Sequence, residues 1–219
     1  MSDTDFDSAL IASFFRVVAD KGWPRANVAE AARAAALPLA EARARFPGRA
    51  FVLVRFGRLA DQAALTEVPA DGTVRDKLFD LLIRRFDTLQ AHRPGVTALL
   101  RALPSDPPTA LLLACATRRS MRWMLQAAGV STVGLRGKLR IRGLMAVWLW
   151  TLRAWERDES ADLSGTMAAL DAALRRAERL GTWLGGGTAS GPESAPADDV
   201  AAADTGTEPP APLPEAPVA

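Results

Sequence analysis

The sequence has one cysteine and one histidine in 219 residues. One cysteine excludes an intramolecular disulfide and any zinc or iron–sulfur site built from several cysteines, and one histidine excludes a multi-histidine metal centre. His92 has no evident serine or cysteine partner and is expected to help end its helix. Cys115 lies in an apolar helical stretch and is expected to be a buried small hydrophobe. We therefore expect no enzyme, no cofactor and no bound metal.

Long apolar runs are also missing. The longest, from Leu144 to Leu152, is interrupted by a threonine and flanked by Arg142 and Arg153. It is far shorter than the ~20 residues that a membrane-spanning helix needs. Residues 1–9 are acidic where a secretory signal would be basic. The expectation is a soluble, cytoplasmic protein.

Charge is distributed unevenly, although the net charge is only +2. Residues 185–219 hold seven prolines, five glycines and six acids with no base and no aromatic, a composition that predicts a disordered tail. The first 184 residues then carry 27 bases and 19 acids. Within them, residues 21–58 hold eight bases and two acids, which suits a polyanionic partner or, alternatively, a solvated arginine-rich surface.

Helical periodicity recurs along the chain, and no alternating strand pattern or internal repeat is found. We predict an all-α chain with a helix-turn-helix domain over 1–50, a helical effector-binding and dimerisation domain over 51–184 and the tail over 185–219. The helices are expected over 8–20, 28–35, 38–45, 49–67, 73–91, 94–103, 109–128, 138–158 and 162–184.

The first fifty residues have the helix-turn-helix layout of a helix, a short helix, a tight break and a second short helix. Such a unit places the second short helix, here 38–45, in the major groove while the first crosses the DNA backbone. Small residues at Ala32, Ala35 and Ala36 would let the two helices cross closely.

This segment resembles the TetR family of transcriptional regulators over about residues 8–60. The resemblance is carried by Gly22-Trp23, by the stretch from Asn27 to Ala32, by Ala35-Ala36-Leu37-Pro38 and by Phe46-Pro47-Gly48-Arg49. It implies a three-helix DNA-binding head. The residues that would contact DNA are Arg25, Asn27, Pro38, Leu39, Arg43, Arg45 and Arg49.

The motif departs from the family pattern at four positions. The turn glycine is replaced by Ala36, the capping serine by Pro38, and the DNA-facing tyrosine by Arg43, while Glu41 stands where threonine is frequent. Arg43 can donate to guanine or to phosphate, so DNA binding is the first hypothesis. The alternative is a helical subdomain of the same fold that no longer binds DNA.

Further stretches that resemble known families are Met121-Arg122-Trp123, Ala128 to Thr132, Arg142 to Trp148, and Asp158 to Asp162 followed by Thr166 and Leu170-Asp171. With them, residues 73–180 resemble the effector and dimer domain of TetR-type proteins and also the ubiquinone-biosynthesis lipid-binding proteins that share the fold. The second resemblance implies a non-DNA accessory protein that binds an isoprenoid lipid and docks on a hydroxylase or a membrane surface. The first implies a homodimer that binds double-stranded DNA and an apolar small molecule or lipid, with the two last long helices at the dimer interface.

A set of methionine and aromatic residues could line an apolar cavity among the helices, although such a set is more often ordinary core. The candidates are Phe86, Met121, Trp123, Met124, Trp148 and Trp155. In the apolar helix 138–158, Trp148 and Trp150 are expected to point in different directions, one toward the pocket and one toward a partner subunit. The basic cluster Arg136 to Arg142 is a candidate for peripheral membrane contact, or else a solvated helix start.

Overall fold

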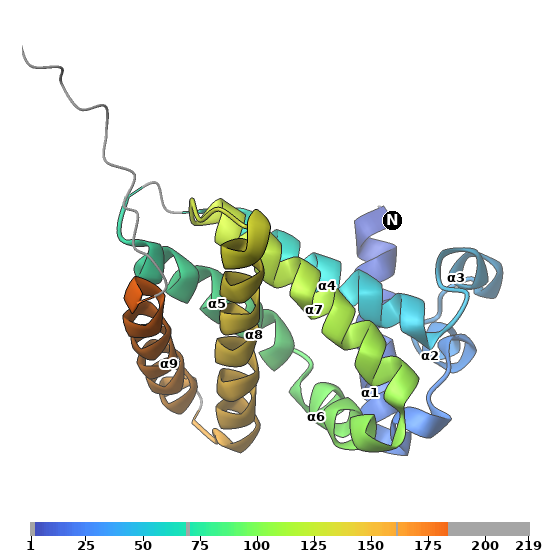
Figure 1. Cartoon of the computed structure of the whole chain (residues 1–219). Helices are drawn as coiled ribbons and strands as arrows, with labels where there is room; N and C mark the ends of the chain where they lie inside the picture. Colours follow the sequence, from blue (N-terminus) through green and yellow to red (C-terminus); the bar gives the residue numbers. More distant parts are fainter. Residues whose placement is uncertain (1–2, 69–70, 161, 184–219) are drawn as a thin grey trace, which may run out of the picture. The chain divides into compact units, whose positions relative to one another are not determined.

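The computed structural model describes residues 3–68, 71–160 and 162–183. In this part of the chain it contains α-helices and two short 3-10 turns, with no strand (Figure 1). The elements are α1 (Asp3–Lys21), η1 (Trp23–Arg25), α2 (Val28–Ala34), α3 (Leu39–Arg45), α4 (Arg49–Leu65), α5 (Val74–Gln90), α6 (Arg93–Ala102), η2 (Leu103–Ser105), α7 (Pro107–Ala127), α8 (Gly134–Arg157) and α9 (Ser164–Trp183). The all-α fold class is confirmed.

The helix ends follow local capping chemistry. Thr73 and Asp76 form a reciprocal capping box at the start of α5, and the Asp106 side chain accepts from the Thr109 amide at the start of α7. Gly22 and Gly129 have positive φ angles directly after α1 and α7. These residues account for most of the predicted boundaries.

Two helices begin earlier than predicted. The first starts at Asp3 rather than residue 8, because Phe6 is buried and two aspartates lie in the favourable first turn. The helix α8 starts at Gly134, inside the segment expected to be a loop. The last helix was predicted to begin at residue 162 and begins at Ser164, directly after Leu163, which has φ 58.

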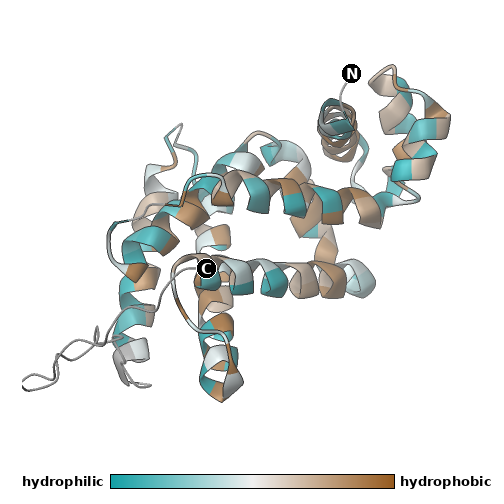
Figure 2. Cartoon of the chain, turned by 90° about the horizontal axis from the view of Figure 1, so that it is seen from above, coloured by the Kyte–Doolittle hydropathy of each residue, from teal (hydrophilic) through white to brown (hydrophobic). Residues whose placement is uncertain are grey.

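One hydrophobic core runs through the helix-turn-helix segment and the later helices, from Phe6 in α1 to Leu174 in α9. Figure 2 shows that the helices carry both hydrophilic and hydrophobic residues, as expected for elements with one packed face. The helix α6 lies directly on α1, because a Cβ at Gly95 would be 2.2 Å from the carbonyl oxygen of Phe15. The core therefore crosses the predicted domain boundary at 50–51 without a break.

The chain divides into two units, Met1–Gly186 and Gly187–Ala219. The predicted tail, 185–219, lies outside the described residues. Among the described helices, none is long and apolar enough to cross a membrane.

Candidate nucleic-acid interface and ligand groove

The segment from α2 to α3 is a tight helix-turn-helix. Asn27 caps α2 by accepting a 2.9 Å hydrogen bond from the Glu30 amide. The turn is closed by the Leu37 amide, which donates to the Ala32 carbonyl at 2.8 Å. Leu37 is buried and anchors the turn to the core beneath it. The layout predicted from the motif is confirmed.

Ala36 occupies the left-handed region of the turn, with φ 53. This conformation favours glycine, because a Cβ crowds the following carbonyl at a cost of roughly 1–2 kcal/mol. The surrounding hydrogen bonds hold Ala36 there, including its own amide donating to the Arg33 carbonyl at 3.0 Å. The chain thus keeps the backbone of a glycine turn without the glycine.

Small side chains bring the three helices of the head into close contact. Ala31, Ala32 and Ala42 are fully buried. The Ser13 hydroxyl of α1 donates to the Ala31 carbonyl of α2 at 2.8 Å. These contacts hold α3 at a fixed angle to α1 and α2, as a helix that enters a DNA groove requires.

The head has a hollow of about 430 Å³ on its surface, between the start of α2, α3 and the start of α4. Four of the seven residues predicted to contact DNA line it, namely Asn27, Leu39, Arg43 and Arg49. Arg25 and Pro38 are exposed on the same head but do not line the hollow. The geometry therefore brings together most of the predicted site.

Arg43 is exposed, and its guanidinium donates to the Pro47 carbonyl at 2.8 Å. Arg25 and Arg33 are also exposed, and neither guanidinium has a hydrogen-bond or ion-pair partner within the described ranges. Glu41, the acid on α3, is paired with Arg45 at 3.0 Å. The pairing offsets the negative charge that would otherwise repel phosphate.

Arg45 does not join the other candidates. Its guanidinium pairs with Asp3 and with Asp7, the latter at 3.3 Å, and lies 4.9 Å from the centre of the Phe6 ring. The hydrogen bond that Arg45 donates to the Asp3 carboxylate is the main cause of the raised pKa of Arg45. The structure thus uses Arg45 to hold α3 to α1, and it lines a second hollow instead of the first.

Arg49 lines the hollow between α2, α3 and α4, but it also contacts residues outside the head. Its guanidinium stacks 4.6 Å from the centre of the Trp23 ring and pairs with Asp106 at 3.3 Å. Asp106 also accepts from the Trp23 indole at 2.8 Å and from Thr109. These hydrogen bonds, led by that of Trp23, lower the pKa of Asp106.

Asp106 is therefore the residue that sequence reasoning missed at this site. It lies 57 positions from Arg49 along the chain and joins the head to the start of α7. The only local signal was an aspartate directly before the helix start and three positions before Thr109, which predicts a helix boundary and no long-range contact.

His92 and Cys115 have no catalytic surroundings. His92 lies between α5 and α6, stacked on Phe15 with ring centres 5.4 Å apart and packed edge-on to Phe56. Burial lowers its pKa, which favours the neutral ring. Cys115 is exposed, so the expectation that it is a buried hydrophobe was wrong.

The six residues predicted to line an apolar cavity do not line a common one. Phe86, Met121, Met124, Trp148 and Trp155 are buried in the core, with Phe86 stacked on Trp148 at 4.5 Å between ring centres. Trp123 is 55% exposed, and its assignment to an apolar cavity was wrong. It falls off the stripe formed by Met121, Met124 and Leu125, since residues on one helix face recur at intervals of three and four.

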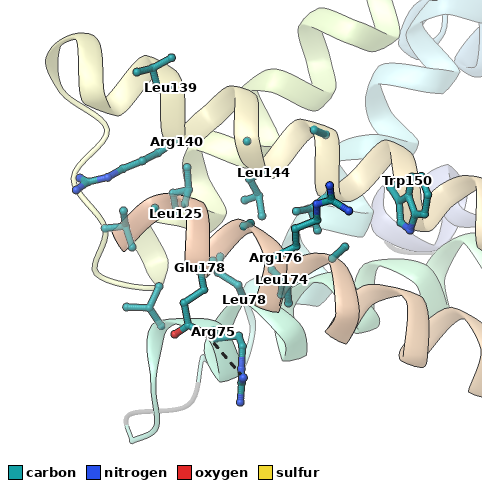
Figure 3. Close-up of a pocket in the computed structure, with 18 of the residues that line it drawn as sticks. Arg75, Leu78, Leu125, Leu139, Arg140, Leu144, Trp150, Leu174, Arg176 and Glu178 are labelled. Carbon is teal, nitrogen blue, oxygen red and sulfur yellow. Dashed lines mark ion pairs between the residues drawn. The ribbon is translucent and has the colours of Figure 1, made fainter. Parts of the chain in front are cut away.

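A large groove instead opens between α5, the end of α7, α8 and α9, with a volume of about 740 Å³ (Figure 3). Its floor consists of Leu78, Leu125, Leu144 and Leu174, one from each of the four helices. The volume is within the usual range for small-molecule sites.

The helix α8 has apolar residues on two faces. Trp148 is buried against Phe86, while Leu149 is 49% and Trp150 is 64% exposed. The expectation that Trp148 and Trp150 point in different directions is confirmed. The second face is large and apolar, which is typical of a surface that packs against a partner.

Solved structures with the same fold are TetR-family regulators. A TetR regulator from Nitrosomonas europaea ATCC 19718 matches with a TM-score of 0.65 and 19% identity, over 80% of this chain and 99% of that chain. A TetR-family regulator from Streptomyces coelicolor matches with a TM-score of 0.56 and 19% identity, over 81% of each chain. A TetR regulator from Rhodococcus sp. RHA1 matches with a TM-score of 0.54 and 15% identity, over 80% of this chain and 97% of that chain.

No protein-family model matches the sequence, and no match was found among curated proteins. The structural matches support the first resemblance made from the sequence and do not favour the ubiquinone-biosynthesis alternative. From the helix-turn-helix head to the paired helices α8 and α9, the chain has the fold of the TetR-family transcriptional regulators.

Proposed function

We propose that the chain is a one-component transcriptional regulator that binds double-stranded DNA through α3 and acts in the cytoplasm. The observation that carries the proposal is the surface of the head, where Asn27, Leu39, Arg43 and Arg49 surround one hollow beside the exposed face of α3. A short helix with a basic, exposed face and a rigid support is the arrangement that reads a major groove.

Arg43 has the central role in this proposal. It replaces the tyrosine that the family resemblance leads one to expect, and its guanidinium can donate two parallel hydrogen bonds to guanine or to phosphate. Its present bond to the Pro47 carbonyl is exposed and can exchange for a DNA acceptor. Arg25 and Arg33 would add sequence-independent phosphate contacts.

The regulator would act as a homodimer, because a single seven-residue recognition helix reads only a half-site. The exposed apolar face of α8 around Leu149 supports this assembly. The variant Leu149→Glu places a charge on that face and should convert the dimer to monomer in sedimentation at micromolar concentration. An unchanged mass would remove this face from the interface.

An effector in the later helices would change DNA affinity by favouring one arrangement of the heads. The contact from Asp106 to Trp23 and Arg49 supports such a link, since it joins the head to α7. Because the five buried candidates pack in the core, the groove between α5, α7, α8 and α9, with its apolar floor, is the site we propose for this effector.

The test is the variant Arg43→Ala, titrated with DNA from the chain's own upstream region. Loss of one bidentate contact should weaken binding by roughly 1–3 kcal/mol, which is about 5- to 150-fold in Kd. Arg101→Ala is the matched control, because Arg101 is an exposed arginine on α6 without a partner in the described residues. Equal affinity of both variants and the natural chain would overturn the proposal.

A further inference from the structure

The groove between α5, α7, α8 and α9 combines an apolar floor with a basic rim. The floor leucines are buried, whereas the rim carries Arg75, Arg136, Arg140 and Arg176 against one acid, Glu178. Only Arg75 is paired with that acid, at 3.8 Å. The groove therefore has an excess of positive charge over an apolar interior.

Two of the rim arginines are available to a ligand. Arg136 and Arg176 are exposed and have no hydrogen-bond or ion-pair partner among the residues that the structure describes. Arg140 donates one hydrogen bond, to the Ser131 carbonyl at 3.1 Å, and keeps further donors. Arg136 and Arg140 lie one turn apart on the same face of α8, so both can approach one anion.

The groove is long as well as amphipathic. Arg140 lies at one end and Trp150 at the other, with the floor leucines between them (Figure 3). Ten residues of helix separate these two side chains, a distance of roughly 15 Å along α8. This length suits an extended aliphatic chain with its charged end toward Arg136 and Arg140.

We propose that this groove binds a single-chain amphipathic carboxylate, that is, a free fatty acid. Arginine binds carboxylates through paired, charge-assisted hydrogen bonds, and the leucine floor takes the aliphatic chain out of water. The regulatory role of this binding rests on the proposed function, whereas the binding itself does not.

Two other occupants fit less well. A second copy of the chain placed over the groove would bring its own basic rim against this basic rim, and surfaces with the same excess charge repel. A bilayer surface is flat on the scale of the groove, whereas a single aliphatic chain can lie along the groove between its walls.

The experiment is calorimetric titration of the full chain with dodecanoate below its micellar concentration. Dodecanol, which has the same chain without the charge, and butyrate, which has the charge on a short chain, are the matched ligands. We expect dodecanoate to bind at least about tenfold more tightly than either. Equal binding of dodecanol would overturn the assignment of an anion, and binding only to anionic phosphatidylglycerol vesicles would overturn the groove as a site for a free ligand.

Two variants separate the charged and apolar parts of the site. Arg136→Gln combined with Arg140→Gln should weaken dodecanoate binding about tenfold or more and leave dodecanol binding unchanged, whereas Arg101→Gln should change neither. Gly143→Phe should weaken both ligands, because Gly143 lines the groove and an added Cβ meets no atom within 4 Å. Gly57→Phe on α4, where a Cβ also meets no atom within 4 Å, is the control.

These outcomes remain distinct from those of the DNA test. Arg43→Ala should bind dodecanoate as the natural chain does, since Arg43 does not line the groove. Failure of DNA binding with dodecanoate binding retained overturns only the proposed function. Unchanged dodecanoate affinity in both groove variants overturns only the fatty-acid site.

Discussion

A buried ion pair joins α4, the helix that follows the recognition helix, to the core of the molecule. Asp61 on α4 pairs with Arg85 on α5, whose side chain is only 7% exposed. The Ser120 hydroxyl of α7 donates to Asp61 at 2.6 Å, and the Arg85 guanidinium lies 5.0 Å from the centre of the Trp148 ring. Desolvation lowers the pKa of Arg85 to about 10, so the group remains charged at neutral pH.

Asp61→Ala should be strongly destabilising, because it leaves the Arg85 charge buried without its acid. Removing one partner of a buried pair costs about 3–5 kcal/mol of unfolding free energy. For a chain of this size the cost corresponds to a fall of roughly 6–20 °C in Tm. The Nε of Arg85 has no hydrogen-bond partner among the described residues, so few contacts remain to compensate for the loss of Asp61.

A double-mutant cycle tests the assignment. Arg85→Met should cost less than Asp61→Ala, because Asp61 is 22% exposed and keeps its bond from Ser120. Combining Asp61→Ala with Arg85→Met should recover most of the loss, since no buried charge remains. Urea unfolding monitored by circular dichroism gives the three free energies. A cost below about 1 kcal/mol for Asp61→Ala, or simple additivity in the double variant, would refute the reasoning.

Three other predictions concern single residues. Ala36→Gly should raise the unfolding free energy by roughly 0.5–1 kcal/mol, because relief of the left-handed strain exceeds the entropic cost of the more flexible unfolded chain. A lower unfolding free energy of this variant in urea would contradict the prediction. The pKa of Asp158 is lowered in the folded chain by hydrogen bonds from Ser160 and Thr166, so its contribution to stability is present above the unfolded pKa of about 3.9 and is lost as pH falls below it. Asp158→Asn should therefore flatten the acid side of the stability profile below pH ~4, and an unchanged profile would argue against the linkage. Cys115 should react with a thiol reagent in the native protein as fast as in urea, whereas protection would show that the thiol is covered.

The sequence predicted the helical elements of the described chain well, because each is marked by local chemistry. The capping residues Asn27 and Thr73, the breaks at Gly22 and Gly129, and the apolar stripes are all readable without tertiary information. The start of α1 was missed because its first turn is stabilised by burial of Phe6, which depends on distant parts of the chain.

The site was predicted less well, because its side chains are assigned by long-range contacts. The exposure of Arg43 could be expected from its place on a short helix. The ion pairs of Arg45 with Asp3 and Asp7 could not, because they join residues about 40 positions apart in the sequence. The buried methionine and tryptophan set has the composition of a ligand pocket, and only packing distinguishes it from core. The groove is lined by residues of four helices, so no single stretch of sequence predicts it.

The central claim is specific DNA binding through α3, and the salt dependence of that binding tests it most directly. Affinities for upstream and random DNA are measured over a range of salt, for the natural chain and for Arg43→Ala. We expect tight binding that prefers upstream DNA, persists at physiological salt and loses this preference in Arg43→Ala. Weak binding that falls equally for both DNAs as salt rises, and that Arg43→Ala leaves unchanged in preference, would contradict the account and leave only a basic surface.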